Sequence, residues 1–217
     1  MKLYRPVGLE ELRLIYESGM CRFPPRLPEQ PIFYPVLNFA YAEQIARGWN
    51  TKSGSLAGYV TEFNVEDVYL ARFEPHIVGS RQHEELWIPA EQLEEFNEHI
   101  TGCITVSGAY FGQNFKGYIP DKFGMKGRDA VAQFILLGSS YHYSPMDFWC
   151  EIRTNNLAVF LHYPFWQQHD FSNESMPLSN NQWLAVTNAL RDTILEAIRT
   201  VWSTKFPQLQ LPEVRRS

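Results

Sequence analysis

The 217-residue sequence predicts an α+β protein built from two parts. Short β-like runs and helical runs follow one another without the long regular repeat of a parallel βαβ fold. Apolar residues make up 45% of the chain and charged residues 20%, so it is neither a disordered chain nor a coiled coil. A stretch between Gly112 and Gly127, with several glycines, lysines and one proline, indicates a boundary near the middle of the chain.

The first part, residues 1–118, alternates short strands and short helices. Apolar residues recur at helical spacing in its helical segments, and its strand segments alternate or are rich in β-branched residues. Asn38 has the side chain of a helix N-cap, and four prolines keep 23–31 out of regular structure. The expected elements are, in order, a strand over 3–7, a helix over 8–19, strands over 32–34, a helix over 39–47, strands over 58–65, 68–73 and 84–88, a helix over 90–99 and a strand over 101–111.

The second part, residues 125–217, is expected to be a small α+β domain. Thr154-Asn155-Asn156 lies between two apolar runs and predicts a hairpin turn. Ser179-Asn180-Asn181-Gln182 matches the capping box that opens a helix, and apolar residues beyond it recur at helical spacing. The expected elements are a helix over 128–137, a β-hairpin formed by 147–153 and 157–163, and a long amphipathic helix over 183–202.

Charge and composition exclude several classes of protein. Residues 1–124 hold 11 Lys and Arg against 16 Asp and Glu, which accounts for the whole net charge of −5. A protein that binds nucleic-acid phosphates needs a basic face, so nucleic acid is not the expected partner. Neither a membrane-spanning run nor a secretory signal is visible, and we expect a cytoplasmic protein without a membrane partner.

Cysteines and histidines offer little obvious chemistry. Cys21, Cys103 and Cys150 are an odd number at wide spacing, which argues against a disulfide framework and against a four-thiolate zinc site. Reduced thiols are therefore expected. His162 and His169, with the neighbouring aspartate, have loose spacing and aromatic neighbours, so no metal site is predicted. Glycine-rich phosphate loops, nucleophile elbows and zinc-protease motifs are also absent from the sequence.

Two charged residues stand inside apolar runs. Arg5 lies in the otherwise apolar first strand, where a guanidinium needs an anionic partner, either a buried carboxylate or a phosphate-bearing ligand. Glu85 opens a strand before Leu86-Trp87-Ile88, so its carboxylate is either oriented into a cleft or is a surface charge at a strand end. These two residues are the sequence's candidates for ligand chemistry.

Three segments carry a resemblance to a known family: Tyr4 to Gly8, Phe23 to Asn38 and Glu85 to Ala90. They resemble a small bacterial family that carries the label ADP-ribosylation/crystallin J1. The order of elements resembles the ADP-ribosyltransferase fold, which has a split sheet with short helices. The resemblance covers roughly residues 3–112, and no family is recognised for the second part.

The resemblance implies a site for NAD as substrate. Glu85 would be the catalytic residue, because its carboxylate would hydrogen-bond the nicotinamide-ribose hydroxyl and stabilise the oxocarbenium-like state. Arg5 and Glu85 would then have to face each other across one ligand-sized crevice with rings between them. The implied cofactor-binding residues are Arg5 and Arg26, which would contact phosphates, and Phe33, Tyr34 and Tyr41, which would orient the nicotinamide ring.

The function expected from the resemblance is an NAD-dependent mono-ADP-ribosyltransferase, a toxin or effector, with a protein target or cognate antitoxin as partner. The alternative is a non-catalytic ADP-ribosyltransferase-like binding or immunity protein, which the acidic first half and the aromatic segment 148–166 favour. A third reading is transfer of an RNA 2′-phosphate to NAD, which needs a basic groove and is disfavoured by the acidic balance. For residues 125–217, ordinary core packing is expected over a dedicated binding surface.

Overall fold

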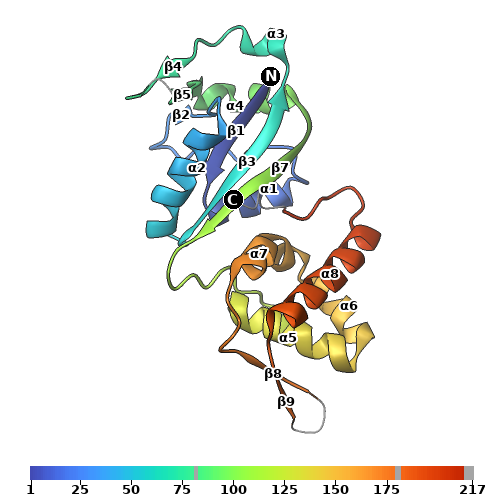
Figure 1. Cartoon of the computed structure of the whole chain (residues 1–217). Helices are drawn as coiled ribbons and strands as arrows, with labels where there is room; N and C mark the ends of the chain where they lie inside the picture. Colours follow the sequence, from blue (N-terminus) through green and yellow to red (C-terminus); the bar gives the residue numbers. More distant parts are fainter. Residues whose placement is uncertain (81–82, 179–181, 213–217) are drawn as a thin grey trace. The chain divides into compact units, whose positions relative to one another are not determined.

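The computed structural model describes residues 1–80, 83–178 and 182–212. It contains both helices and strands, which confirms the α+β class (Figure 1). The chain separates into two compact units, which we call unit 1 (residues 1–114) and unit 2 (residues 115–212). Among the described helices, none has the length and apolar character needed to cross a membrane.

Unit 1 is built on an antiparallel sheet in the order β1-β3-β7, with β3 in the middle. Figure 1 shows α2 on one side of these strands, with α1 and α4 behind them. The elements of unit 1 are β1 (Lys2–Val7), α1 (Leu9–Glu17), β2 (Ile32–Phe33), α2 (Phe39–Gly48), β3 (Ala57–Val65), α3 (Asp67–Leu70), β4 (His76–Ile77), β5 (Glu84–Glu85), β6 (Ile88–Pro89), α4 (Leu93–Glu98) and β7 (Ile100–Phe111).

The row of strands continues past β1 through a single residue. Val36 exchanges two backbone hydrogen bonds with Tyr4, at 2.8 and 2.9 Å, and it also bridges to Glu85 on its other side. β5 in turn pairs with β4. Residues directly opposite each other in a sheet project to the same face, so Tyr4, Val36 and Glu85 share one face.

The two faces of this sheet are covered by different helices. Helix α2 buries Ala42 and Ala46 against Val36 and Val60, and it approaches β3 closely. A Cβ added to Gly58 in β3 would lie 2.1 Å from the carbonyl oxygen of Ala46, so only glycine allows this contact. The opposite face carries a cluster of buried rings: Phe23, Phe33, Phe63 and Phe96.

Most local predictions for unit 1 are confirmed. The side chain of Asn38 accepts the backbone N–H of Tyr41 at 2.8 Å and caps α2. The predicted strand over 68–73 is wrong, because Asp67–Leu70 forms the single helical turn α3. Short apolar runs carry no periodicity that separates strand from helix. The predicted strand over 84–88 is two short strands, β5 and β6, which pair with different partners.

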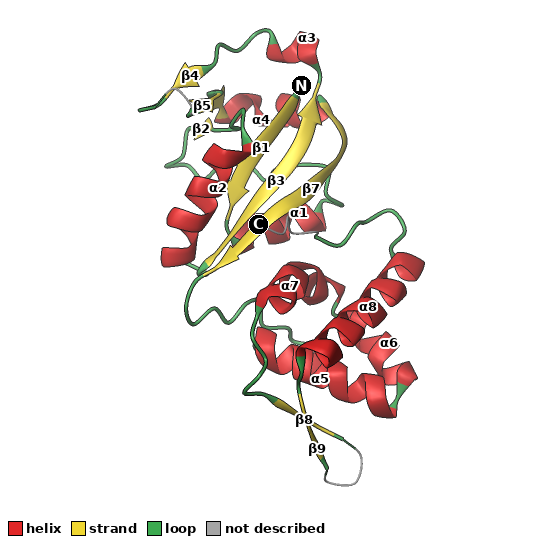
Figure 2. Cartoon of the chain, viewed as in Figure 1, coloured by secondary structure: helices red, strands yellow, loops and turns green. Residues whose placement is uncertain are grey.

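Unit 2 is mainly helical and carries one small hairpin of β8 and β9 (Figure 2). Its core is aromatic and includes Phe134, Phe160, Trp166 and Trp202, all fully buried or nearly so. Its elements are α5 (Ala130–Tyr143), α6 (Pro145–Thr154), α7 (Asn156–Gln168), β8 (Ser175–Pro177), β9 (Trp183–Ala185) and α8 (Asn188–Lys205).

The predicted hairpin over 147–163 is wrong. Its two runs are the helices α6 and α7, and the proposed turn is the junction between them. Helix α7 is buried from Ala158 to Trp166, so apolar residues occupy every side and no helical period is visible in the sequence. The start of α6 is marked by Ser144, whose hydroxyl accepts the N–H of Asp147 at 3.2 Å, with Pro145 at the first position.

The long C-terminal helix exists but begins later than predicted. Trp183–Ala185 forms β9, and α8 begins at Asn188 with Thr187 as its N-cap, accepting the N–H of Leu190 at 3.2 Å. The first three residues of the predicted capping box, 179–181, lie outside the described residues. The apolar stripe of the prediction was therefore right over α8 and wrong over β9.

Candidate functional site

The residues predicted to bind NAD fall into two groups on opposite faces of the unit 1 sheet. Glu85 shares the face of Tyr4, because Val36 is paired with both. Arg5 follows Tyr4 in β1, and successive side chains in a strand point to opposite faces. The guanidinium of Arg5 and the carboxylate of Glu85 therefore do not face each other across one crevice, which corrects the arrangement expected from the resemblance.

Arg5 is held by groups of its own face. Its Nε donates to Glu11 at 2.8 Å, its Nη1 donates to the carbonyl oxygen of Tyr34 at 3.2 Å, and the guanidinium lies 4.4 Å from the centre of the Phe33 ring. The residue is 6% exposed. The anionic partner predicted for Arg5 is thus the carboxylate of Glu11, a group of the protein itself.

Arg26 joins the same group through Glu11, which lies 3.8 Å from its Nη1, while its Nη2 donates to Gln30 at 2.6 Å. Its Nε is buried and has no hydrogen-bond partner. Burial lowers the pKa of Arg26, and repulsion from Arg5 adds to this, whereas Glu11 opposes it. Two guanidinium groups, one from β1 and one from the proline-rich segment 23–31, therefore share the carboxylate of Glu11 in α1.

The other face holds a compact group that we call the Glu85 cluster: Tyr34, Tyr41, His76, His83, Glu85 and Trp87. At its centre Glu85 is 8% exposed. One carboxylate oxygen accepts the indole N–H of Trp87 at 2.8 Å, and the other accepts the hydroxyl of Tyr41 at 3.3 Å. Of the predicted residues, Tyr41 contacts Glu85 directly and Tyr34 reaches the cluster through the ring of Trp87. Arg5, Arg26 and Phe33 are grouped with Glu11 instead.

The rings around Glu85 stack in pairs. His83 stacks on Tyr41 with ring centres 4.2 Å apart, and His76 stacks on Trp87 at 4.3 Å. Tyr34 meets Trp87 edge to face at 6.2 Å. Trp87 is 42% exposed and Tyr34 is 38% exposed. The site therefore combines the buried carboxylate of Glu85 with two partly exposed aromatic rings.

The phenol of Tyr41 is held in its protonated, neutral form by its surroundings. Burial raises the pKa of Tyr41, and the neighbouring charge and hydrogen bond of Glu85 raise it further. A neutral phenol is the form that donates to a carboxylate. With both oxygens of Glu85 engaged by donors from the protein, the open aromatic faces are the part of the cluster that offers new contacts to a ligand or partner.

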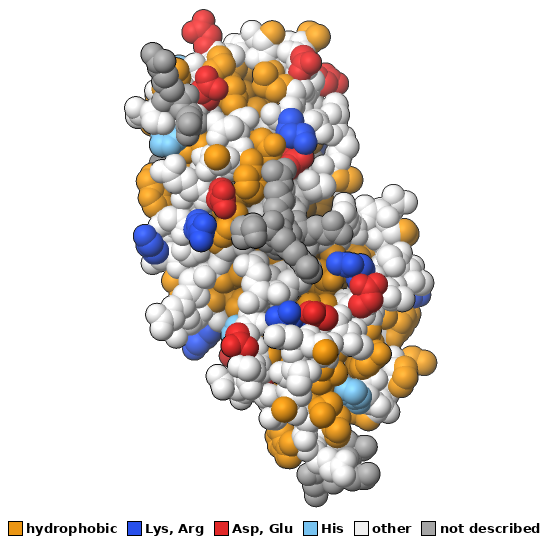
Figure 3. All heavy atoms as spheres, in the orientation of Figure 1, with side chains coloured by type: hydrophobic (Ala, Val, Ile, Leu, Met, Phe, Trp, Pro, Cys, Tyr) orange, Lys and Arg blue, Asp and Glu red, His pale blue; other side chains and the backbone are white. Residues whose placement is uncertain are grey.

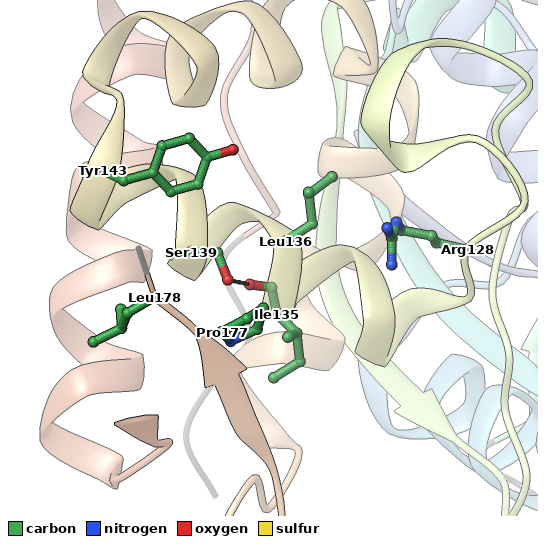
Figure 4. Close-up of a pocket in the computed structure, with 7 residues that line it drawn as sticks. All are labelled: Arg128, Ile135, Leu136, Ser139, Tyr143, Pro177 and Leu178. Atoms are coloured by element: carbon green, nitrogen blue, oxygen red, sulfur yellow. Dashed lines mark hydrogen bonds between the residues drawn. The ribbon is translucent and has the colours of Figure 1, made fainter. Parts of the chain in front are cut away.

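Unit 2 contains a separate hollow beside α5 and β8, with a volume of about 350 Å³. Figure 4 shows Tyr143, Leu178 and Pro177 on one side of it and Arg128 on the other. Ile135, Leu136 and Ser139 complete the lining, and the Ser139 hydroxyl donates back to the Ile135 carbonyl at 3.0 Å. The lining is mostly apolar with one guanidinium at its edge.

The histidine considered as a metal ligand has a structural role. His162 is completely buried; its Nε2 accepts the N–H of Tyr118 at 2.8 Å and its Nδ1 lies 2.8 Å from Oε1 of Gln133. Burial lowers its pKa to about 3, so the ring is neutral and Nδ1 carries the proton. Within the described ranges, no group of three or more potential metal-ligating side chains is found.

Basic side chains on the face drawn in Figure 3 stand apart from one another, with acidic and apolar groups between them. Affinity for a nucleic-acid backbone rises with the number of phosphates that neighbouring Lys and Arg neutralise together. Among the described residues on this face, Lys and Arg form no such patch.

The chain matches no protein-family model, no curated protein and no solved structure.

Sequence reasoning missed three members of the Glu85 cluster. In the sequence Trp87 is only an apolar neighbour of Glu85, although its position two residues later in an extended segment places both side chains on one side. His76 and His83 gave no signal, because they join the cluster only through the short β4-β5 pairing and the loop that connects these strands.

Proposed function

We propose that unit 1 is an ADP-ribosyltransferase-like scaffold that binds a basic protein partner without catalysing a reaction. The main support for this proposal is that Arg5 and Glu85 lie on opposite faces of the sheet. Each is already bound by a neighbouring side chain, Arg5 by Glu11 and Glu85 by Trp87. A catalytic pair for NAD would have to contact one ligand from both ends. These two side chains are arranged as parts of two separate supporting networks.

The surface chemistry of the Glu85 cluster supports protein binding. Trp and Tyr are enriched among residues that dominate binding energy at protein interfaces. Trp87 and Tyr34 present partly exposed rings here, and Ile77 and Val78 add exposed aliphatic groups from β4 and the residue that follows it. The excess of acidic residues in the first half of the chain favours a basic partner through electrostatic complementarity.

The test uses the full-length chain as bait in extracts of cells that naturally contain it. A candidate partner is purified, and its affinity is measured for wild type, Trp87→Ala and Trp49→Ala. Trp49 is the matched control because it is also exposed in unit 1 but lies at the end of α2, outside the cluster. We expect Trp87→Ala to weaken binding about tenfold or more and Trp49→Ala to leave it unchanged.

Binding should also weaken as salt is raised, because charge complementarity is screened. A partner whose affinity is insensitive to Trp87→Ala would remove the cluster from the interface. Release of nicotinamide from NAD by the purified wild-type chain would overturn the non-catalytic assignment.

A second candidate function keeps the NAD-dependent transferase and places its site on the Glu85 cluster alone. One observation favours it: a nearly buried carboxylate lies among the rings of Tyr34, Tyr41 and Trp87, which is part of the residue set implied for nicotinamide and ribose. Phosphate contacts would then have to come from groups other than Arg5.

The two functions separate in one assay. Nicotinamide release from NAD is measured for wild type, Glu85→Gln and Glu84→Gln. Glu84 is the control because it precedes Glu85 in β5 and its side chain points to the other face. Activity that Glu85→Gln abolishes and Glu84→Gln preserves would establish the transferase. Absence of nicotinamide release in all three chains supports the binding module.

A further inference from the structure

An irregular segment of unit 1, residues 22–28, has the sequence Arg-Phe-Pro-Pro-Arg-Leu-Pro and contains neither a helix nor a strand. Pro24, Pro25 and Pro28 have φ fixed at about −65°, and each proline also keeps the residue before it out of the helical conformation. No residue of the segment has a positive φ. These restraints favour the polyproline II helix, an extended conformation with about three residues per turn.

The buried side chains of the segment follow this period. Phe23 is 2% exposed and packs within the ring cluster on its face of the sheet. Three residues later, the side chain of Arg26 is 11% exposed and lies beside Glu11. Residues three apart lie on the same edge of a polyproline II helix, so one edge of the segment is anchored in unit 1.

The two other edges of the segment are at the surface. Leu27 is 54% exposed. Pro25 and Pro28 are also exposed, and Pro24 is partly exposed. The segment therefore presents a row of prolines and one leucine outward, on a backbone that unit 1 holds in place.

A cation stands at the beginning of this apolar row. Arg22 forms an ion pair with Glu94, and their side chains are 42% and 71% exposed. An exposed pair of this kind contributes little to stability. The guanidinium of Arg22 can therefore exchange Glu94 for an acidic group of a partner at small cost.

Protein domains of the SH3 type bind polyproline II helices in a groove lined by aromatic side chains. The ligand inserts two edges of its helix, while the remaining edge points away from the groove. Acidic side chains at one end of the groove bind a cation next to the proline core. In this chain the edge that would point away is that of Phe23 and Arg26, which unit 1 already buries, so a docked domain and unit 1 would occupy different sides of the segment.

We propose that segment 22–28 docks into a partner domain of the SH3 type. Arg22 enters the acidic end of its groove, and the aromatic groove takes the side chains of Pro24, Pro25, Leu27 and Pro28. Because unit 1 holds the segment extended before binding, little affinity is lost to ordering of the chain. The segment contains no residue of the Glu85 cluster, so this docking site is independent of the proposed function.

The test measures binding of the full-length chain to a panel of purified SH3 domains that prefer ligands with an arginine before the proline core, by isothermal titration calorimetry. We expect at least one domain to bind wild type. Leu27→Ala and Pro28→Ala should each weaken this binding about tenfold. Pro75→Ala is the matched control, because Pro75 is an exposed proline of unit 1 outside the segment, and it should leave the affinity unchanged.

Two further variants test the charge and the place of the contact. Arg22→Glu should weaken binding more than tenfold, and wild-type binding should weaken as salt is raised. Trp87→Ala in the Glu85 cluster should leave the affinity unchanged. Leu27→Ala removes only an exposed side chain, so its effect does not depend on a change in the fold.

The proposal is overturned if no domain of the panel binds wild type. Binding that Leu27→Ala and Pro28→Ala leave unchanged would also overturn it, as would equal losses for Pro28→Ala and Pro75→Ala. A loss confined to Trp87→Ala would place the contact on the Glu85 cluster and would remove segment 22–28 from the interface.

Discussion

Arg5 and Glu85 project from opposite faces of one sheet because Tyr4, and not Arg5, is in register with Glu85 through Val36. Each charge consequently has its hydrogen-bond partners on its own face of the sheet. Arg5 donates to Glu11, and Glu85 accepts from Trp87 and Tyr41. A buried charge whose partner is removed destabilises a fold more than an exposed one does.

Arg5→Leu should strongly destabilise unit 1. The substitution removes the 2.8 Å partner of Glu11 and leaves it only Arg26 at 3.8 Å, in a site where the Arg5 side chain is 8% exposed. We expect a loss of roughly 3 kcal/mol in the free energy of unfolding, measured by urea denaturation. Arg13→Leu, which breaks more exposed pairs with Glu10 and Glu17, should cost less than about 1 kcal/mol. Equal losses for the two variants would show that burial does not set the strength of the Arg5 pair.

The two donors to Glu85 should differ in strength. Trp87→Phe removes the 2.8 Å hydrogen bond and Tyr41→Phe removes the 3.3 Å bond, while each variant keeps an aromatic ring. Because a charged acceptor strengthens a short hydrogen bond, we expect about 2 kcal/mol for Trp87→Phe and about 1 kcal/mol for Tyr41→Phe. Urea denaturation of both variants measures the loss in free energy of unfolding for each. A larger loss for Tyr41→Phe than for Trp87→Phe would contradict the geometry of the cluster.

Unit 2 should lose stability as the solution is acidified. His162 has a folded pKa of about 3 and an ordinary value near 6.5, so the unfolded state binds more protons between these values. The stabilisation is complete above pH 6.5 and falls by about 1.4 kcal/mol for each pH unit below it. Urea denaturation followed at several pH values between 7 and 4.5 measures this slope.

The matched variant for this pH effect is His162→Gln, which removes the titrating group. Its stability is expected to be lower at pH 7 because the acceptor for the Tyr118 N–H is disturbed. Its pH slope between 6.5 and 4.5 should be smaller than that of wild type. An unchanged slope would assign the acid sensitivity to other groups.

Gly58→Ala should separate α2 from β3. The added Cβ would lie 2.1 Å from the backbone oxygen of Ala46, and a backbone group cannot move aside as a flexible side chain does. We expect a loss of roughly 1–3 kcal/mol, measured by thermal or urea unfolding. At Gly8 a Cβ meets nothing within 4 Å, so Gly8→Ala is the control and should change stability by less than about 1 kcal/mol.

Local sequence patterns were sufficient for elements whose signals lie within a few residues. The Asn38 cap, the helical spacing in α1 and the β-branched run of β7 each act through neighbouring hydrogen bonds or one exposed face, so they were readable without a structure. They failed in α7, where burial on all sides removes the period, and in α3, which is a single turn.

The sequence by itself determined the α+β composition, the charge distribution and the presence of an arginine and a glutamate that need partners. Only the tertiary structure decided which partners they have, because the pairing of Val36 with both Tyr4 and Glu85 joins chain segments far apart in sequence. Side chains alternate between faces along a strand, so the register of distant segments determines which groups can act together.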